Sequence, residues 1–164
     1  ALFLARSGRK VLLVDANRTA PAGDRVFGKA EGQPGLSEVL AEMGLLEEAI
    51  QPTETDHLMV MHQSGAGAAA DYDMTQLSRL DHELRQRFDW VLYDAGSLPD
   101  AVTRDVLQAA GKALFITTAV DPAVSARACE QIERCGAVNL GVVNNTCRVS
   151  TAAKSPGSAA GIGT

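Results

Sequence analysis

The chain has 164 residues, of which 46% are hydrophobic and 21% are charged, and its formal net charge is −5. This length and composition predict one globular domain with its own core, not two domains. The negative charge argues against a broad nucleic-acid-binding surface, which would need clustered lysine and arginine. The three cysteines show no CxxC spacing, so we interpret them as reduced thiols of a cytoplasmic protein.

The segment Ala1–Ser7 has the character of the last part of a helix. Gly8 suits a helix C-cap, and the basic residues Arg9 and Lys10 suit the negative end of a helix dipole. The apolar run is too short for a signal peptide or a membrane span. We therefore expect the chain to be the remainder of a longer protein.

Short apolar runs alternate with segments of helical periodicity along the chain. The expected strands are Val11–Asp15, His57–His62, Trp90–Asp94, Ala113–Thr117 and Leu140–Asn144. The expected helices are Leu36–Met43, Met74–Arg87, one opened by Pro99, and one capped by Asp121 and stopped by Gly136. This alternation predicts an α/β fold with a doubly wound, mostly parallel sheet covered by helices on both faces.

Two segments have the composition of loops. Ala16–Pro34 contains glycine and proline and predicts a long loop, of the kind that is usually functional or mobile. The last residues, 150–164, are small and rich in glycine and alanine, and they predict a disordered tail. The expected domain therefore covers residues 1–149.

Two of the expected strands end in an aspartate, at Asp15 and at Asp94. Apolar strands buried on both faces deliver such residues to the carboxyl edge of a parallel sheet, where ligands bind. Carboxylates there can hold magnesium or orient a hydroxyl that attacks a phosphate. The alternative is that each aspartate caps the turn that follows its strand. The pair, together with Asn144 and Asn145 after another strand, favours the functional interpretation.

Two glycine-rich segments match phosphate-binding patterns incompletely. Gly23–Ala30 is one residue short of a P-loop, lacks the final hydroxyl residue and does not follow a strand directly. Gly65–Ala70 matches a dinucleotide-binding fingerprint, although the next strand-end acid, Asp94, comes later than usual. The second segment is explained equally well as small residues in a flexible loop.

The remaining candidates have ordinary structural explanations. His57, His62 and His82 lack metal-ligand spacing and are interpreted as edge-strand or solvated helix-face residues. Trp90 is expected to pack at the start of its strand.

The runs VLLVDANRTAPAGDRVFG, PGLSEVL, LLEEAI, FDWVLYDAG and GVVNN, in this order and spacing, resemble bacterial tyrosine kinases of capsular and exopolysaccharide synthesis. These kinases are part of the deviant-Walker ATPases, together with MinD and ParA. The resemblance covers most of residues 7–145. It implies a P-loop NTPase sheet whose first strand and phosphate loop precede Val11–Asp15 and lie outside this chain.

The resemblance also implies roles for individual residues. Asp15 matches the first acid of the second Walker motif and Asp94 the Walker B acid, so both are candidate catalytic and magnesium-binding residues. Asn17 stands where a second acid is usual, and an amide there lacks the charge. Asn145 matches an asparagine that reads the adenine edge. The tyrosine cluster at the C-terminus of these kinases is absent, because the chain has only Tyr72 and Tyr93.

The expected function is therefore that of a fragment of a cytoplasmic, ATP- and Mg²⁺-binding kinase or ATPase, weak or inactive by itself. Expected partners are a membrane-protein activator of polysaccharide export and further copies of the protein. One alternative is a non-catalytic regulatory module of a polysaccharide-export or partitioning complex. A weaker alternative is an NAD-binding oxidoreductase domain that uses Gly65–Ala70.

Overall fold

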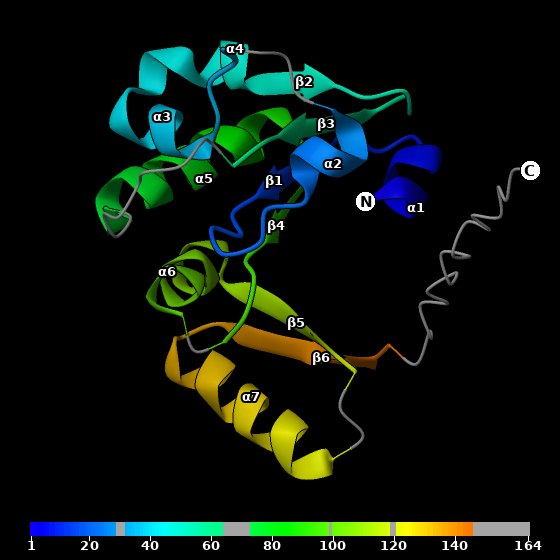
Figure 1. Cartoon of the computed structure of the whole chain (residues 1–164), viewed down its shortest axis with the longest axis vertical. Helices are drawn as coiled ribbons and strands as arrows, with labels where there is room; N and C mark the ends of the chain where they lie inside the picture. The colour runs from blue at the N-terminus through cyan, green and yellow to red at the C-terminus, as the bar shows by residue number, and fades with distance from the viewer. Residues whose placement is uncertain (29–31, 64–72, 99, 119–120, 146–164) are drawn as a thin grey trace, which may run out of the picture.

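The computed structural model describes residues 1–28, 32–63, 73–98, 100–118 and 121–145 (Figure 1). Within these ranges the strands form two separate sheets. The first sheet has the order β2-β3-β1-β4, with β1 parallel to β3 and β4, and β2 antiparallel to β3. Its strands are β1 (Val11–Asp15), β2 (Ile50–Pro52), β3 (Leu58–Met61) and β4 (Trp90–Asp94). The second sheet pairs β5 (Lys112–Thr117) with β6 (Val138–Asn144) in parallel.

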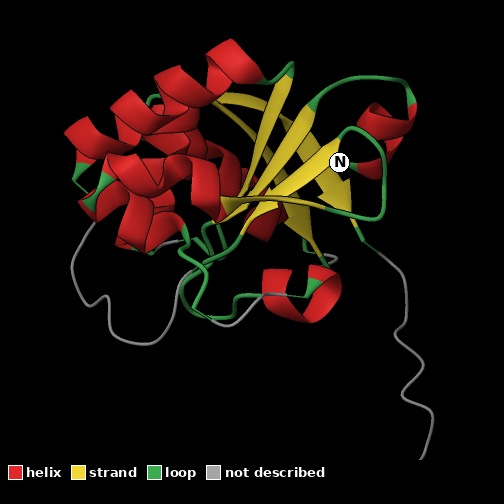
Figure 2. Cartoon of the chain, turned by 90° about the horizontal axis from the view of Figure 1, so that it is seen from above, coloured by secondary structure: helices red, strands yellow, loops and turns green. Residues whose placement is uncertain are grey.

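Figure 2 shows most of the helices gathered on one side of the strands. The helices are α1 (Leu2–Arg6), α2 (Gly23–Phe27), α3 (Leu36–Ala41), η1 (Met43–Leu45, a 3₁₀ turn), α4 (Leu46–Ala49), α5 (Met74–Arg87), α6 (Ala101–Ala110) and α7 (Pro122–Arg134). The three longer helices start in the same way. Asp73, Asp100 and Asp121 each accept a hydrogen bond from the backbone N–H two residues on. These aspartates satisfy donors that the first helical turn leaves unpaired.

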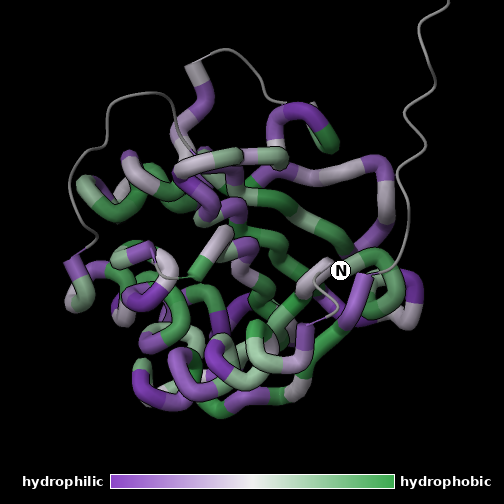
Figure 3. The backbone as a smooth tube through the Cα atoms, turned by 60° about the horizontal axis from the view of Figure 1, so that its bottom comes forward, coloured by the Kyte–Doolittle hydropathy of each residue, from purple (hydrophilic) through white to green (hydrophobic). Residues whose placement is uncertain are grey.

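The larger core lies between the four-stranded sheet and α5. Leu12 and Val14 of β1 are fully buried, and so are Leu77, Leu80 and Leu84, which recur along one face of α5. A smaller core joins α6, β5 and α7 around Leu107, Ala113, Ile132 and Ala137. Figure 3 shows the hydrophobic segments following the strands through the interior. The four-stranded sheet therefore holds most of the buried apolar surface.

Several expected elements are confirmed with their bounds, namely Val11–Asp15, Trp90–Asp94 and Met74–Arg87. The expected loop over Ala16–Pro34 is wrong in part, because α2 lies inside it. The helix expected over Leu36–Met43 ends at Ala41, where the chain tightens into the 3₁₀ turn η1. The helix expected from Pro99 begins at Ala101 instead, because Asp100 supplies its cap.

Other predictions concern residues outside the described ranges. The fingerprint Gly65–Ala70, the residues Lys29 and Ala30, Tyr72 and the tail 150–164 all lie there, so the predictions made for them remain predictions. Trp90 does start β4 as expected, but 48% of its surface is exposed.

Candidate functional site

Asp15 and Asp94 are neighbours at the carboxyl ends of β1 and β4. The two residues are register partners in the parallel pairing of these strands. The backbone N–H of Ala16, directly after Asp15, donates to the carbonyl oxygen of Asp94 at 2.9 Å. The two acids therefore reach the same edge of the sheet, the edge at which open α/β sheets bind ligands.

Asp15 is buried, with only 4% of its surface exposed, and its carboxylate organises the turn that follows β1. Its Oδ2 accepts hydrogen bonds from the N–H groups of Ala22 at 2.9 Å and Gly23 at 2.7 Å. Its Oδ1 accepts one from Asn17 at 3.1 Å. Asp15 therefore does cap the turn that follows its strand, which was the alternative to a functional role.

Asp94 has the opposite environment. Its side chain is exposed, and the hydrogen bond that its Oδ1 accepts from the N–H of Gly96 is long, at 3.4 Å. The loop after it is fixed by α6, because the buried hydroxyl of Thr103 donates to the carbonyl oxygens of Ala95 at 2.6 Å and Ser97 at 3.1 Å. Asp94 is therefore a solvent-facing carboxylate on a fixed backbone.

Asn17 lies against the loop that follows Asp94. Its Oδ1 accepts a hydrogen bond from the N–H of Ala20 at 3.0 Å. Gly96 has φ +77°, and a Cβ at this position would lie 2.8 Å from Asn17 Oδ1. A glycine is required there both by the backbone conformation and by the contact. The structure therefore brings Asp15, Asn17 and Asp94 together, as expected from the sequence.

A histidine that the sequence analysis interpreted as an edge-strand residue belongs to this region. His62, directly after β3, is fully buried, and its Nδ1 lies 2.8 Å from Oδ1 of Asp24 in α2. A Cβ on Gly23 would lie 2.9 Å from His62 Nδ1 and 3.0 Å from Asp15 Oδ2. Helix α2 is thus held at the sheet edge from two sides. The edge-strand interpretation of His62 is wrong, because β3 pairs with a strand on each side and because α2, which was not expected, contacts this histidine.

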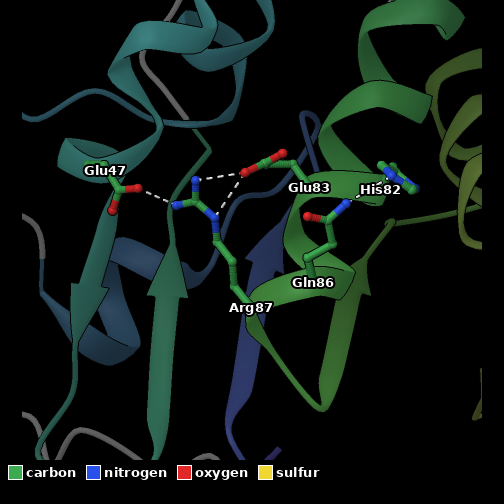
Figure 4. A network of polar contacts seen from close by, with 5 residues as sticks. All are labelled: Glu47, His82, Glu83, Gln86 and Arg87. Atoms are coloured by element: carbon green, nitrogen blue, oxygen red, sulfur yellow. Dashed lines mark hydrogen bonds and ion pairs between the residues drawn. The ribbon is translucent and has the colours of Figure 1, made fainter.

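The other two histidines differ from His62. His57 and His82 are exposed, and His82 shares a hydrogen bond with Gln86 at 2.9 Å on the surface of α5 (Figure 4).

Asn145 lies after β6, in the second sheet. Its backbone N–H donates to the carbonyl oxygen of Thr117 at 2.7 Å, which continues the β5–β6 pairing. The structure does not pair this sheet with the strands that carry Asp15 and Asp94. Asn145 therefore comes to the end of a strand as expected, but on a separate sheet.

Tyr93, the residue before Asp94, is half-buried and donates a hydrogen bond to Asp81 Oδ1 at 3.1 Å. Burial and the neighbouring Asp81 carboxylate raise the pKa of the Tyr93 phenol above its ordinary range. Arg85 pairs with the other oxygen of Asp81 and also donates to the carbonyl oxygen of Ala110. This network joins α5, β4 and the end of α6 next to the strand end that carries Asp94.

The donor set at the edge suits magnesium only in part. Asp94 offers an exposed, weakly bonded carboxylate and Asp15 a carboxylate that already accepts three backbone hydrogen bonds, and carboxylate oxygens are ligands that magnesium prefers. Among the described residues, however, no group of three or more His, Cys, Asp and Glu side chains is arranged to hold a metal ion. Such a site needs further ligands, for example phosphate oxygens. In the same part of the chain no helix has the length and apolarity required to cross a membrane.

Comparison with known proteins gives several bacterial tyrosine-protein kinases and an archaeal ATP-binding protein. No family model matches the chain. The chain is 26% identical over 155 residues to the tyrosine-protein kinase YwqD of Bacillus subtilis, an alignment that covers 92% of this chain and 65% of that protein. The chain thus spans slightly less than two thirds of the length of this relative.

The fold has close counterparts among solved structures. The kinase domain of the Escherichia coli tyrosine kinase ETK matches with a TM-score of 0.76 at 21% identity, over 96% of this chain and 64% of that one. The septum site-determining protein MinD of Pyrococcus horikoshii, solved with Mg-ADP, matches with a TM-score of 0.73 at 20% identity, over 87% and 60%. The resemblance expected from the motifs is confirmed: the chain is a relative of bacterial tyrosine-protein kinases and has the P-loop fold that they share with MinD ATPases.

Proposed function

We propose that the chain supplies Asp15 and Asp94 as the acidic edge of a domain that binds ATP and magnesium. The domain would be part of a cytoplasmic protein like the tyrosine kinases of exopolysaccharide synthesis. The observation that carries this proposal is the register pairing of Asp15 with Asp94 at the carboxyl ends of two parallel strands. The similarity to tyrosine-protein kinases and to a MinD solved with Mg-ADP supports it.

The two acids would have different tasks. Asp94, exposed and weakly bonded, would act through the water shell of the magnesium ion. Asp15 would offer Oδ1 on the metal side as acid or base, while its Oδ2 holds α2 in place. When bound, magnesium would neutralise charge on the phosphates. Asn17 and Asn145 would be nucleotide contacts, Asn145 toward the adenine.

The phosphate-cradling amides and the lysine that neutralises the β- and γ-phosphates would come from a loop upstream of Val11, outside this chain. Without them, the two acids repel the triphosphate, so the 164-residue chain would bind nucleotide weakly. In the cell, a membrane-protein activator and further copies of the protein would be the partners.

Isothermal titration with ATP and magnesium tests the proposal. A longer form that carries the upstream loop should bind with micromolar affinity and the 164-residue chain much more weakly, and Asp94→Asn should weaken binding by the longer form about tenfold or more. Asp56→Asn is the matched control, because Asp56 is exposed and precedes β3 at the opposite edge. Equal affinity of the Asp94→Asn and Asp56→Asn variants would contradict the proposal, as would micromolar binding by the short chain.

A non-catalytic regulatory module is the second candidate. The observation that favours it is the state of Asn17, an amide whose oxygen is engaged by the N–H of Ala20. The hydroxyl of Tyr93, the other tyrosine besides Tyr72, donates a hydrogen bond to Asp81 and is thus engaged in the folded protein. This candidate predicts that the longer form incorporates no phosphotyrosine when it is incubated with labelled ATP, whereas a kinase would label itself or a partner.

The nicotinamide-binding alternative rests on Gly65–Ala70, which lie outside the described residues. A fluorescence titration with NADH tests it, and lack of binding would exclude it.

A further inference from the structure

Thr103, in the first turn of α6, is a buried polar residue that has no part in the proposed function as stated so far. Only 4% of its surface is exposed. Its hydroxyl donates to the carbonyl oxygens of Ala95 at 2.6 Å and of Ser97 at 3.1 Å, both in the loop that follows Asp94. A valine would fill a similar volume but would leave both carbonyl groups without this donor. The residue type at this position is therefore explained by the loop after Asp94 and not by the packing of α6.

Helix α6 gives this hydroxyl a fixed position. Val102 and Val106, on the same helix, are buried in the larger core. Asp100 caps the helix by accepting a hydrogen bond from the N–H of Val102 at 2.9 Å, and its own N–H donates to the carbonyl oxygen of Ser97 at 3.2 Å. The loop after Asp94 is thus bonded to the start of a helix that the core holds in place.

The bond to Ala95 also sets the direction of the next N–H group. In a trans peptide the carbonyl and the N–H of the following residue point to opposite sides. Because the carbonyl of Ala95 points to the Thr103 hydroxyl, the N–H of Gly96 points away from it, and its nitrogen lies 3.4 Å from Asp94 Oδ1. The Thr103 hydroxyl therefore orients a backbone donor that faces the Asp94 carboxylate.

The same loop lies against the turn that follows Asp15. A Cβ on Gly96 would lie 2.8 Å from Asn17 Oδ1, so the Gly96 backbone and the Asn17 side chain are in close contact. The N–H of Asn17 donates to Asp15 Oδ1 at 3.1 Å. A displacement of Gly96 would therefore displace Asn17 and change the position of Asp94 relative to Asp15.

We propose that Thr103 is a positioning residue for the acidic edge, because its hydroxyl fixes the loop that sets the spacing of Asp15 and Asp94. This inference rests on the proposed function, since it concerns the same two acids and the same magnesium and nucleotide ligands. Removal of a group that orients metal-binding side chains typically lowers metal affinity by about tenfold or more. Thr103 itself would contact neither the metal ion nor the nucleotide.

NMR on the 164-residue chain tests the positioning without any ligand. In the unsubstituted chain the N–H of Gly96 should have an order parameter of about 0.85, the value of a rigid backbone. Thr103→Val, which lacks the hydroxyl, should lower this value and shift the Gly96 signal, whereas Thr103→Ser, which keeps the hydroxyl, should restore both. Thr75→Val is the matched control, because Thr75 is exposed in the first turn of α5.

Isothermal titration of the longer form with ATP and magnesium tests the consequence at the acidic edge. Thr103→Val should weaken binding about tenfold, and Thr103→Ser should bind like the unsubstituted protein. The titrations are run at a temperature at which circular dichroism shows all variants to be folded, so that a loss of stability does not enter the affinity.

An order parameter below about 0.6 for Gly96 in the unsubstituted chain would overturn the inference, and this measurement does not depend on whether Thr103→Val folds. A Gly96 signal or an ATP affinity that is the same in Thr103→Val as in Thr75→Val would also overturn it, as would a Thr103→Ser variant that restores neither. If the longer form binds no ATP while the NMR results hold, the proposed function fails and the role of Thr103 in fixing the loop stands, which separates the two.

Discussion

The two sheets of the molecule differ in how completely they are built. The four-stranded sheet buries Leu12, Val14 and the apolar face of α5 in one continuous core. The two-stranded sheet has a small core and leaves several large apolar side chains exposed, namely Leu114, Ile116, Val138, Leu140, Val142 and Val143. The difference shows that the strands of the four-stranded sheet are covered by helices more completely than β5 and β6 are.

The largest effect on stability is expected from a leucine-to-alanine change in the larger core, compared with the same change in the smaller core. Leu80→Ala, in the larger core, should lower the free energy of unfolding by about 2–5 kcal/mol, because a fully buried leucine leaves a cavity. Leu107→Ala, in the smaller core, should cost less, since Leu107 has fewer buried neighbours. Urea unfolding of both variants measures this. Equal losses would show that the two halves are equally well packed.

The next prediction compares how much Asp15 and Asp94 each contribute to the free energy of unfolding. Asp15→Asn should cost about 1–3 kcal/mol, because a buried carboxylate loses charge-assisted bonds from three backbone N–H groups. Asp94→Asn should change stability by no more than about 0.5 kcal/mol, since the side chain is exposed and weakly bonded. Chemical denaturation measures the free energy of unfolding of both variants. A larger loss at Asp94 would contradict the environments described for the two residues.

The third effect depends on pH. The pKa of Tyr93 is raised by burial, so above about pH 10 the unfolded chain loses a phenol proton that the folded chain keeps. The folded state then binds more protons, and stability falls as pH rises, by up to about 1.4 kcal/mol per pH unit. Tyr93→Phe should show a shallower decline between pH 9 and 11 in urea-unfolding midpoints. Parallel pH curves for the two proteins would refute this.

The smallest effect is expected at the surface between α4 and α5. Arg87 pairs with Glu83 at 2.8 Å and with Glu47 (Figure 4). Because Glu47 is largely exposed, Glu47→Gln should cost no more than about 0.5 kcal/mol and less in high salt. Glu130→Gln, which breaks the exposed Arg134 pair, is the control. A loss at Glu47 well above that at Glu130 would show that Arg87 has a structural role.

The sequence predicted what depends on local patterns. Apolar runs ending in Asp15 and Asp94 gave the strands and the shared edge, because a buried parallel strand leaves a clear hydrophobic run. The regular leucines of α5 gave its bounds. Asp121 was recognised as a cap because an aspartate before a proline at the first turn is a strong local signal.

What the sequence did not predict depends on contacts between distant residues. Helix α2 has five residues, too few to be stable by itself, and it is held by Asp15 and by the contact between Asp24 and His62. The burial of His62 follows from that same helix. The glycines at positions 23 and 96 were a usable signal, since each lies where a side chain would collide with a site residue.

The central claim is that Asp15 and Asp94 form one magnesium- and nucleotide-binding edge. Paramagnetic broadening of NMR signals by Mn²⁺, added with ADP to the longer form, tests this claim most directly. The account predicts broadening of the amides of Ala16 and Gly96, which adjoin the two acids, and none at His57, at the opposite end of β3. Broadening at His57 with sharp signals at Ala16 and Gly96 would contradict it.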